Sequence, residues 1–211
     1  MIYGIDEAGR GCIIGPMVIA IAGIDPMKEY ELKEMGVKDS KELSPKKRSE
    51  LYEPVKKICK IKSIHISAKE LDEMMGKYSL NEIEAIKISQ LLKETEKEDT
   101  VFIDSPDNIP ENFSKRIRKY VPRPPKLVSE NKSDHKHLIV GAASIIAKVE
   151  RDMEIEKIKK ELGYDFNSGY TSDKYTIEFL EKHGKEAKVQ KYLRHKWSTL
   201  KNIEQRKLAE F

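Results

Sequence analysis

The chain has 211 residues, of which 38% are hydrophobic and 36% are charged, so it is long enough for one domain of ordinary size plus an appendage. Its longest apolar stretch, residues 12–24, is too short and too broken by Gly15 and Pro16 to span a bilayer, so we expect no membrane segment. The acidic N-terminus argues against a signal peptide, and two isolated cysteines form neither a metal motif nor a disulfide framework, so we expect a cytoplasmic protein.

The net charge of +4 is concentrated at the C-terminal end. Residues 171–211 carry ten basic and six acidic side chains, whereas residues 1–170 carry 30 of each sign. A neutral body with a basic end fits an anionic polymer as partner, and it equally fits a solvated, lysine-rich helix surface. Charge alone leaves both interpretations open.

In chain order, the apolar runs Ile2–Asp6 and Met17–Ile24 predict two strands, and their short separation favours an antiparallel hairpin with a wide loop. Ser44 followed by Pro45 predicts the start of a helix that continues toward Cys59. Residues 61–66 predict a third strand. Two capping boxes, Ser67 with Glu70 and Ser79 with Glu82, then predict the starts of two helices.

The second half of the chain predicts two more strands, Thr100–Asp104 and Lys126–Ser129. A long helix is expected from Leu138 to about Leu162, and its first half is apolar nearly all round, which is typical of a buried helix. Residues 173–211 carry helix patterns only. The order predicts an α/β fold with a mixed five-stranded sheet flanked by helices, a domain over residues 1–170 and a small helical, basic segment over residues 171–211.

Four carboxylates stand at the ends of apolar runs that are far apart in the chain: Asp6, Glu7, Asp104 and Asp134. If the strands share one sheet, these acids converge, and clustered carboxylate oxygens suit hard divalent cations such as Mg²⁺ or Mn²⁺. Each acid has a simpler alternative as a turn former or helix cap. Asp6 and Glu7 are neighbours, so both face one site only if the strand ends there.

Several strings occur in an order that resembles ribonuclease HII, the type 2 ribonuclease H, and most of all its archaeal branch. The resemblance covers residues 1 to about 200, and the strings are Gly4-Ile5-Asp6-Glu7-Ala8-Gly9-Arg10-Gly11, Asp39-Ser40-Lys41-Glu42-Leu43, Ile103-Asp104, Lys132-Ser133-Asp134, residues 142–152, and Asn167-Ser168-Gly169-Tyr170. It implies a ribonuclease H-like fold and an endonuclease that hydrolyses the RNA strand of RNA/DNA hybrids. It also implies cleavage at ribonucleotides embedded in duplex DNA, with 5′-phosphate and 3′-OH products and two divalent ions, Mg²⁺ or Mn²⁺.

The resemblance implies roles for individual residues. Asp6, Glu7, Asp104 and Asp134 match the metal-binding carboxylates. Gly9, Arg10 and Gly11 match a loop that detects the ribose 2′-OH, the group that distinguishes RNA from DNA; by itself this loop would be an ordinary hairpin turn. Tyr170 matches a residue that packs on the sugar of an RNA–DNA junction, and Lys41 matches a phosphate contact; a partly buried tyrosine and a surface lysine are the alternatives. Ser144 and Lys148 on the buried helix are expected to be structural.

Some positions depart from the family pattern or lie beyond it. Cys12 stands where proline usually follows the Gly-Arg-Gly loop, and His135 and His137 follow Asp134 as metal-proximal or simply surface residues. At the C-terminus, Gln205, Leu208 and Phe211 have the spacing of a peptide that docks on sliding clamps. We expect a monomer. Two rival functions stay open: another ribonuclease H-like nuclease such as a resolvase, and a non-catalytic hybrid-binding module.

Overall fold

The computed structural model describes residues 1–37 and 43–200. It divides into two compact units. The first comprises residues 1–8, 18–64 and 79–150, and the second comprises residues 9–17, 65–78 and 151–211. Neither unit is one continuous stretch, and the predicted division at residue 170 stays a prediction.

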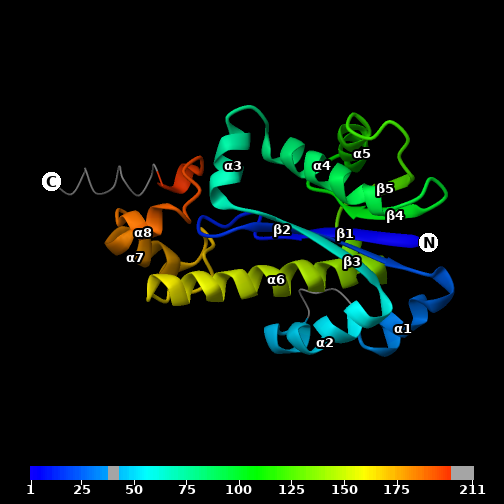
Figure 1. Ribbon diagram of the computed structural model, residues 1–211, viewed down its shortest axis with the longest axis horizontal. Coiled ribbons are helices and arrows are strands. Elements are labelled where there is room, and N and C mark those ends of the chain that lie inside the picture. The colour runs from blue at the N-terminus through cyan, green and yellow to red at the C-terminus, as the bar shows by residue number, and fades with distance from the viewer. Residues whose placement is uncertain (38–42, 201–211) are drawn as a thin grey trace. The chain divides into compact units, whose positions relative to one another are not determined.

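The sheet has five strands in the order β3-β2-β1-β4-β5 (Figure 1). Strand β1 pairs antiparallel with β2 and parallel with β4, and β4 pairs parallel with β5. The mixed five-stranded sheet and all five predicted strands are therefore confirmed. The strand bounds are Ile2–Ala8 for β1, Met17–Ile24 for β2, Lys60–Ile66 for β3, Thr100–Asp104 for β4 and Lys126–Glu130 for β5.

Helix α6 (Leu138–Leu162) covers one face of the sheet with its first half. Its apolar residues share a core with β2 and with helix α2 (Pro45–Ile58), beside the short helix α1 (Glu29–Glu34). Gly4 of β1 makes this contact possible, because a Cβ added there would lie 2.3 Å from the Ile139 carbonyl oxygen. The all-round apolar pattern of residues 138–147 thus reflects real burial on every side.

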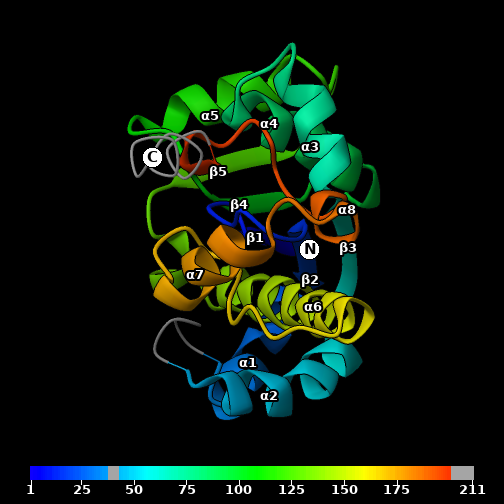
Figure 2. The same ribbon diagram turned by 90° about the vertical axis from the view of Figure 1, so that its left-hand side faces the viewer.

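Helices α4 (Leu80–Leu91) and α5 (Pro110–Arg118) pack on each other, and α5 packs on β5. Figure 2 shows the sheet between this pair of helices and α6. Ile103 of β4, Ile83 of α4 and Phe113 of α5 are all buried. Helices therefore flank both faces, as predicted.

The predicted helix starts are confirmed by their caps. Ser44, Ser67 and Ser79 accept hydrogen bonds from the backbone N–H groups three residues later, at the starts of α2, α3 (Ala68–Met75) and α4. Each cap satisfies one of the donors that a helix leaves free at its first turn. Helix α1 and the 3₁₀ turn η1 (Pro26–Lys28) were not predicted, since neither contains an amphipathic repeat.

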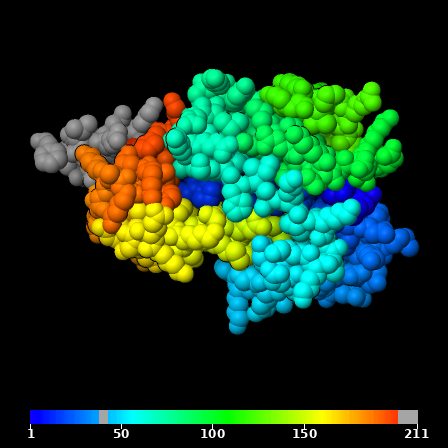
Figure 3. All heavy atoms as spheres, viewed as in Figure 1, coloured from blue at the N-terminus to red at the C-terminus, as the bar shows by residue number. Residues whose placement is uncertain are grey.

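The second unit is built around the second half of α6, together with α3, α7 (Lys174–His183) and α8 (Ala187–Gln190). Its core joins Ile155 and Leu162 of α6 to Phe179 of α7 and Val189 of α8. The orange residues of α7 and α8 lie directly on the yellow end of α6 in Figure 3. Within residues 1–37 and 43–200, no helix is long and apolar enough to cross a membrane.

Candidate active site

Asp6 lies inside the first unit on the face of β1 that packs on α6. Residues two apart on a strand share a face, and Gly4 contacts α6, so Asp6 faces the same helix. The residue is only 4% exposed. One carboxylate oxygen, Oδ1, accepts a hydrogen bond from the Glu7 N–H at 2.8 Å, and the other lies 3.6 Å from the Lys148 ammonium.

Lys148 was expected to be structural, but the structure places its charge beside Asp6. Its ammonium also donates to the Ser144 hydroxyl one turn earlier on α6. A helix that is apolar nearly all round gives no indication of which face meets the acid, so the sequence pattern could not reveal this pair. Lys148 therefore joins the candidate site as a cation beside Asp6.

Asp104 is linked to the turn that carries Asp134 by a hydrogen bond to the backbone of Ser133. The parallel register aligns Ile5 with Ile103, so Asp104 ends the strand next to Asp6. Its Oδ1 accepts a 2.8 Å hydrogen bond from the Ser133 N–H, at the start of the 3₁₀ turn η4 (Ser133–His135) that carries Asp134. Asp134 is 3% exposed and both of its carboxylate oxygens are shielded from solvent.

Glu7 is placed differently from the other three acids. Strand β1 continues through Ala8, with Glu7 aligned to Ile19 and Ala8 to Val18. The condition under which Asp6 and Glu7 would both face one site, a strand that ends between them, is therefore not met. On a regular pleat the half-buried Glu7 side chain would point to the opposite side from Asp6, so Glu7 would join the other three acids only if the end of β1 rearranges.

The donor chemistry of the site fits a hard divalent cation, because three carboxylates from β1, β4 and η4 supply only oxygen ligands. Within the part of the chain that the structure describes, however, no three His, Cys, Asp or Glu side chains are already gathered around one ion position. Coordination of one ion by all three carboxylates would thus require side-chain rearrangement. Joint coordination by Asp6, Glu7, Asp104 and Asp134 stays a prediction.

The Gly9–Gly11 loop belongs to the second unit, and glycine is sterically required at position 9. Gly9 has φ +80°, and a Cβ there would lie 2.6 Å from the Pro16 carbonyl oxygen. A Cβ on Gly11 would lie 3.8 Å from the Tyr170 ring, an ordinary contact distance. Cys12, directly after the loop, forms an antiparallel bridge with Tyr170. The structure therefore brings the loop and Tyr170 together.

Tyr170 is half-buried beside the Arg151 guanidinium and the Cys12 thiol. Burial, with the adjacent Cys12, raises the pKa of Tyr170 to about 12, so the ring stays neutral at physiological pH. The Arg151 guanidinium lies over the ring, 4.8 Å from its centroid, and donates a 2.9 Å hydrogen bond to the Cys12 sulfur. Burial also raises the pKa of the Cys12 thiol, although Arg151 and Arg194 oppose this. Cys12 therefore packs and accepts a hydrogen bond at the position where the family more often has proline.

Of the remaining predicted residues, the two histidines lie in the described part of the chain, and the others lie outside it. His135 is exposed, whereas His137 stacks on Phe102 with 4.0 Å between ring centroids and bonds Glu130 at 2.6 Å. Together with Lys136, whose contribution is the largest, His137 lowers the pKa of Glu130. Lys41 and the sliding-clamp peptide residues Gln205, Leu208 and Phe211 lie outside the described residues.

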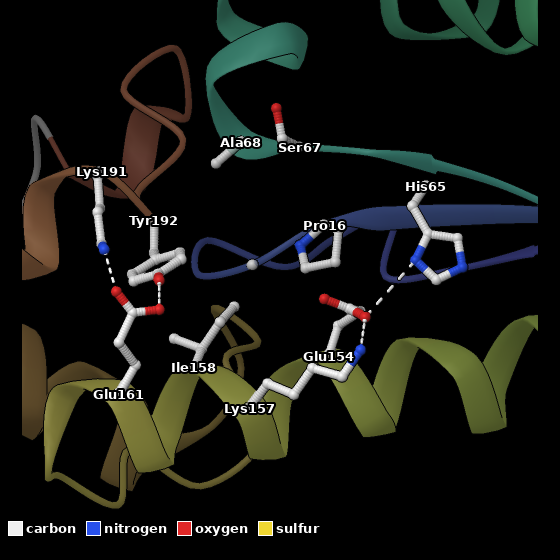
Figure 4. Close-up of a pocket in the computed structure, with 11 residues that line it drawn as sticks. Pro16, His65, Ser67, Ala68, Glu154, Lys157, Ile158, Glu161, Lys191 and Tyr192 are labelled. Carbon is white, nitrogen blue, oxygen red and sulfur yellow. Dashed lines mark hydrogen bonds and ion pairs between the residues drawn. The ribbon is translucent and has the colours of Figure 1, made fainter.

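The second unit also contains a cavity of about 340 Å³ that sequence patterns did not indicate (Figure 4). Ile158 and Pro16 supply apolar wall, and Glu154 and Glu161 of α6 line it with their carboxylates. Each carboxylate is already engaged: Glu154 by Lys157, and Glu161 by Lys191 and the Tyr192 hydroxyl. Of the predicted site residues that the structure describes, none lines this cavity.

Comparison with known proteins identifies the family. The ribonuclease HII family model matches residues 3–200. Ribonuclease HII of Archaeoglobus fulgidus is 41% identical over 208 residues, which covers 99% of this chain and 98% of that protein. The structure of the PCNA:RNase HII complex from the same organism superposes with a TM-score of 0.88 at 40% identity, covering 100% of both chains. Ribonuclease H2 of Pyrococcus horikoshii superposes with a TM-score of 0.84 at 38% identity, covering 97% of each chain. The chain therefore belongs to the ribonuclease HII family, whose metal-dependent endonucleases cleave the RNA strand of RNA/DNA hybrids and cut at embedded ribonucleotides.

Proposed function

We propose that this chain cleaves RNA/DNA hybrids and embedded ribonucleotides at a centre formed by Asp6, Glu7, Asp104 and Asp134, leaving 5′-phosphate and 3′-OH ends. One observation carries the proposal. Asp6 lies near the carboxyl end of β1, Asp104 ends the neighbouring parallel strand β4, and Asp104 is hydrogen-bonded to the turn that holds Asp134. This arrangement brings acids that are about 130 residues apart in the sequence to one edge of a sheet.

The carboxylates would hold two divalent ions, Mg²⁺ or Mn²⁺. When bound, such ions supply activation of a water molecule and stabilisation of charge at the scissile phosphate and the leaving 3′-oxygen. The chain itself contributes the low exposure of Asp6 and Asp134, which strengthens electrostatic attraction between these carboxylates and a cation. Lys148 would neutralise part of the Asp6 charge before an ion arrives.

Recognition of the sugar is assigned to the second unit. Loop residues Gly9, Arg10 and Gly11 would bind the ribose 2′-OH through backbone groups, because glycines let a ligand approach the main chain closely. Tyr170 is paired with Cys12, directly after the loop, and stays neutral, so its ring offers an apolar surface to a deoxyribose at an RNA–DNA junction. Exposed basic residues of the 171–211 segment, such as Lys182 and Lys185, would attract duplex phosphates, and Lys41 would add one phosphate contact.

The test is cleavage mapping on duplexes that contain one, four or all ribonucleotides in one strand, with Mg²⁺ and then Mn²⁺. Cleavage is expected only at ribonucleotides, and Asp104→Asn should abolish it while the folded structure persists, because the asparagine oxygen still accepts from Ser133. Asp25→Asn is the matched control. Asp25 directly follows β2, at the end of the strand that pairs with Ile2 and lies away from Asp6, and its side chain caps η1. Cleavage of an all-DNA duplex would instead favour a resolvase-like enzyme, and normal turnover by Asp104→Asn would contradict the proposed centre.

We also infer a sliding clamp as a protein partner, with the chain itself a monomer. A related protein of 40% identity has been solved in a complex with PCNA, which supports this partner. The docking residues would be Gln205, Leu208 and Phe211. Phe211→Ala should abolish capture by the immobilised clamp, whereas the neighbouring control Glu210→Ala should not; equal capture of both variants would remove this assignment.

The proposed location is the cytoplasm. Cys12 and Cys59 are both free and buried, which suits a reducing compartment.

A further inference from the structure

Arg194 is the largest fully buried side chain of the molecule's described part, and its guanidinium is hydrogen-bonded to backbone carbonyls. Its Nε donates to the Gly15 oxygen at 3.0 Å, and its Nη1 donates to the Arg10 oxygen at 3.1 Å. Arg10 is the middle residue of the Gly9–Gly11 loop, and Gly15 lies just beyond that loop. One planar side chain from the C-terminal segment thus fixes two carbonyls on either side of Cys12.

Ion pairing does not explain this burial. Among residues 1–37 and 43–200, no carboxylate lies within ion-pair distance of Arg194, and the Asp72 oxygens accept instead from the His195 and Lys196 N–H groups at 2.7 and 3.0 Å. The Arg194 Nη2 is buried and has no hydrogen-bond partner among the described residues. Burial lowers the pKa of Arg194 to about 10. A buried charge is costly and apolar replacements are often tolerated, so the charge itself does not explain an arginine here; the guanidinium lies 4.9 Å from the Trp197 ring centroid and donates to the two loop carbonyls.

The hydrogen bond to the Arg10 oxygen has a geometric consequence for the loop. In a planar trans peptide, the carbonyl of one residue and the N–H of the next point in opposite directions. Drawing the Arg10 oxygen toward buried Arg194 therefore directs the Gly11 N–H away from the interior, and Gly11 is exposed. The Cys12 N–H donates to the Gly9 oxygen at 3.2 Å and closes the turn, but this bond does not fix the orientation of the central Arg10–Gly11 peptide, which the bond from Arg194 restrains.

The geometry points to Arg194 as a positioning residue that orients the Arg10–Gly11 peptide and so sets the preference for a ribose over a deoxyribose. This inference rests on the proposed role of the Gly9–Gly11 loop. It deepens that role by naming the residue that holds the loop from its buried side.

The experiment measures duplex binding by fluorescence anisotropy in Mg²⁺, with Asp104→Asn in every protein to prevent cleavage. Two duplexes of one sequence are compared, one all-DNA and one with a single ribonucleotide. The Kd of the all-DNA duplex divided by the Kd of the ribonucleotide duplex gives the ratio that reports sugar preference. Both values come from one preparation, so a loss of folded protein scales them equally and leaves the ratio unchanged. A purely structural role of Arg194 would therefore not move the ratio.

Arg194→Met should lower the ratio about tenfold, or to one if the parent ratio is smaller; tenfold corresponds to roughly 1.4 kcal/mol. Arg194→Lys should lower it less, because lysine keeps the charge and one donor group but lacks the planar fork. Lys196→Met is the charge-matched control: Lys196 is exposed, so its loss should weaken both duplexes equally.

Three outcomes separate the claims. If the parent protein shows no preference for the ribonucleotide, the proposed function of the loop fails, and this inference fails with it. If the parent has a preference that Arg194→Met retains in full, only the inference is overturned. Should Arg194→Met not fold, Arg194→Lys decides: a lowered ratio supports the positioning role, and an unchanged ratio overturns it.

Discussion

Replacing Gly4 with alanine adds one methyl group and should be among the most destabilising substitutions of this size in the first unit. The added Cβ would lie 2.3 Å from the Ile139 oxygen and 2.4 Å from both the Ile139 carbonyl carbon and the Val140 nitrogen. All three are backbone atoms of α6, so no side-chain rotation relieves the overlap. Either β1 or α6 must move, and both belong to the core of the unit.

The expected cost follows from this geometry. Overpacking a core usually costs 1–3 kcal/mol, and a clash with rigid backbone on both sides belongs at the upper end, so we expect about 3 kcal/mol or more. Gly36→Ala is the matched control, since its Cβ would meet nothing within 4 Å while its φ of +81° strains an alanine. That strain alone should cost about 1 kcal/mol.

Urea unfolding followed by circular dichroism measures both variants. With a slope of roughly 2 kcal/mol per molar urea, Gly4→Ala should lower the midpoint by about 1.5 M, and Gly36→Ala by about 0.5 M. A Gly4→Ala midpoint equal to or above that of Gly36→Ala would refute the claim that strand and helix are in backbone contact at this point.

Two further perturbations test individual charges. Lys148→Met removes the cation 3.6 Å from Asp6, so the affinity for Mn²⁺ measured by calorimetry should rise by about 1 kcal/mol, or roughly fivefold; unchanged or weaker binding would contradict the placement of Lys148. Burial by itself raises the pKa of Asp173, but hydrogen bonds from Ser168, Asn167 and Tyr175 outweigh it and lower the pKa to about 2. Because the folded pKa is depressed, the stabilisation is complete above pH 4 and disappears as the pH falls through about 2. Asp173→Asn should therefore reduce the free energy of unfolding by about 1–2 kcal/mol at pH 7 and by almost nothing near pH 2, and a pH-independent difference would oppose this explanation.

Much of the fold could be predicted because its patterns are local. The helix Leu138–Leu162 has the predicted bounds, and the serine caps of α2, α3 and α4 stand where the sequence placed them. The convergence of Asp6 with Asp104 followed from strand order. That convergence needs only parallel pairing of two strands that each carry an acid near the carboxyl end.

Other features depend on tertiary contacts that no local pattern records. Lys148 approaches Asp6 only because α6 packs at one particular rotation. Arg194 stands in a run of basic residues that is typical of an exposed surface, yet it is fully buried, a state that is rare for arginine. The continuation of β1 past Asp6 likewise depends on pairing with β2 as far as Val18.

The buried guanidinium groups of Arg151 and Arg194 affect how the stability of the second unit changes with temperature. The hydration of a charged group becomes less favourable as the temperature rises, so the free-energy penalty for keeping these groups away from water shrinks on heating. The advantage of an apolar substitute such as methionine should accordingly be greatest in the cold and decline toward high temperature. An interior of this kind suits a protein that operates hot.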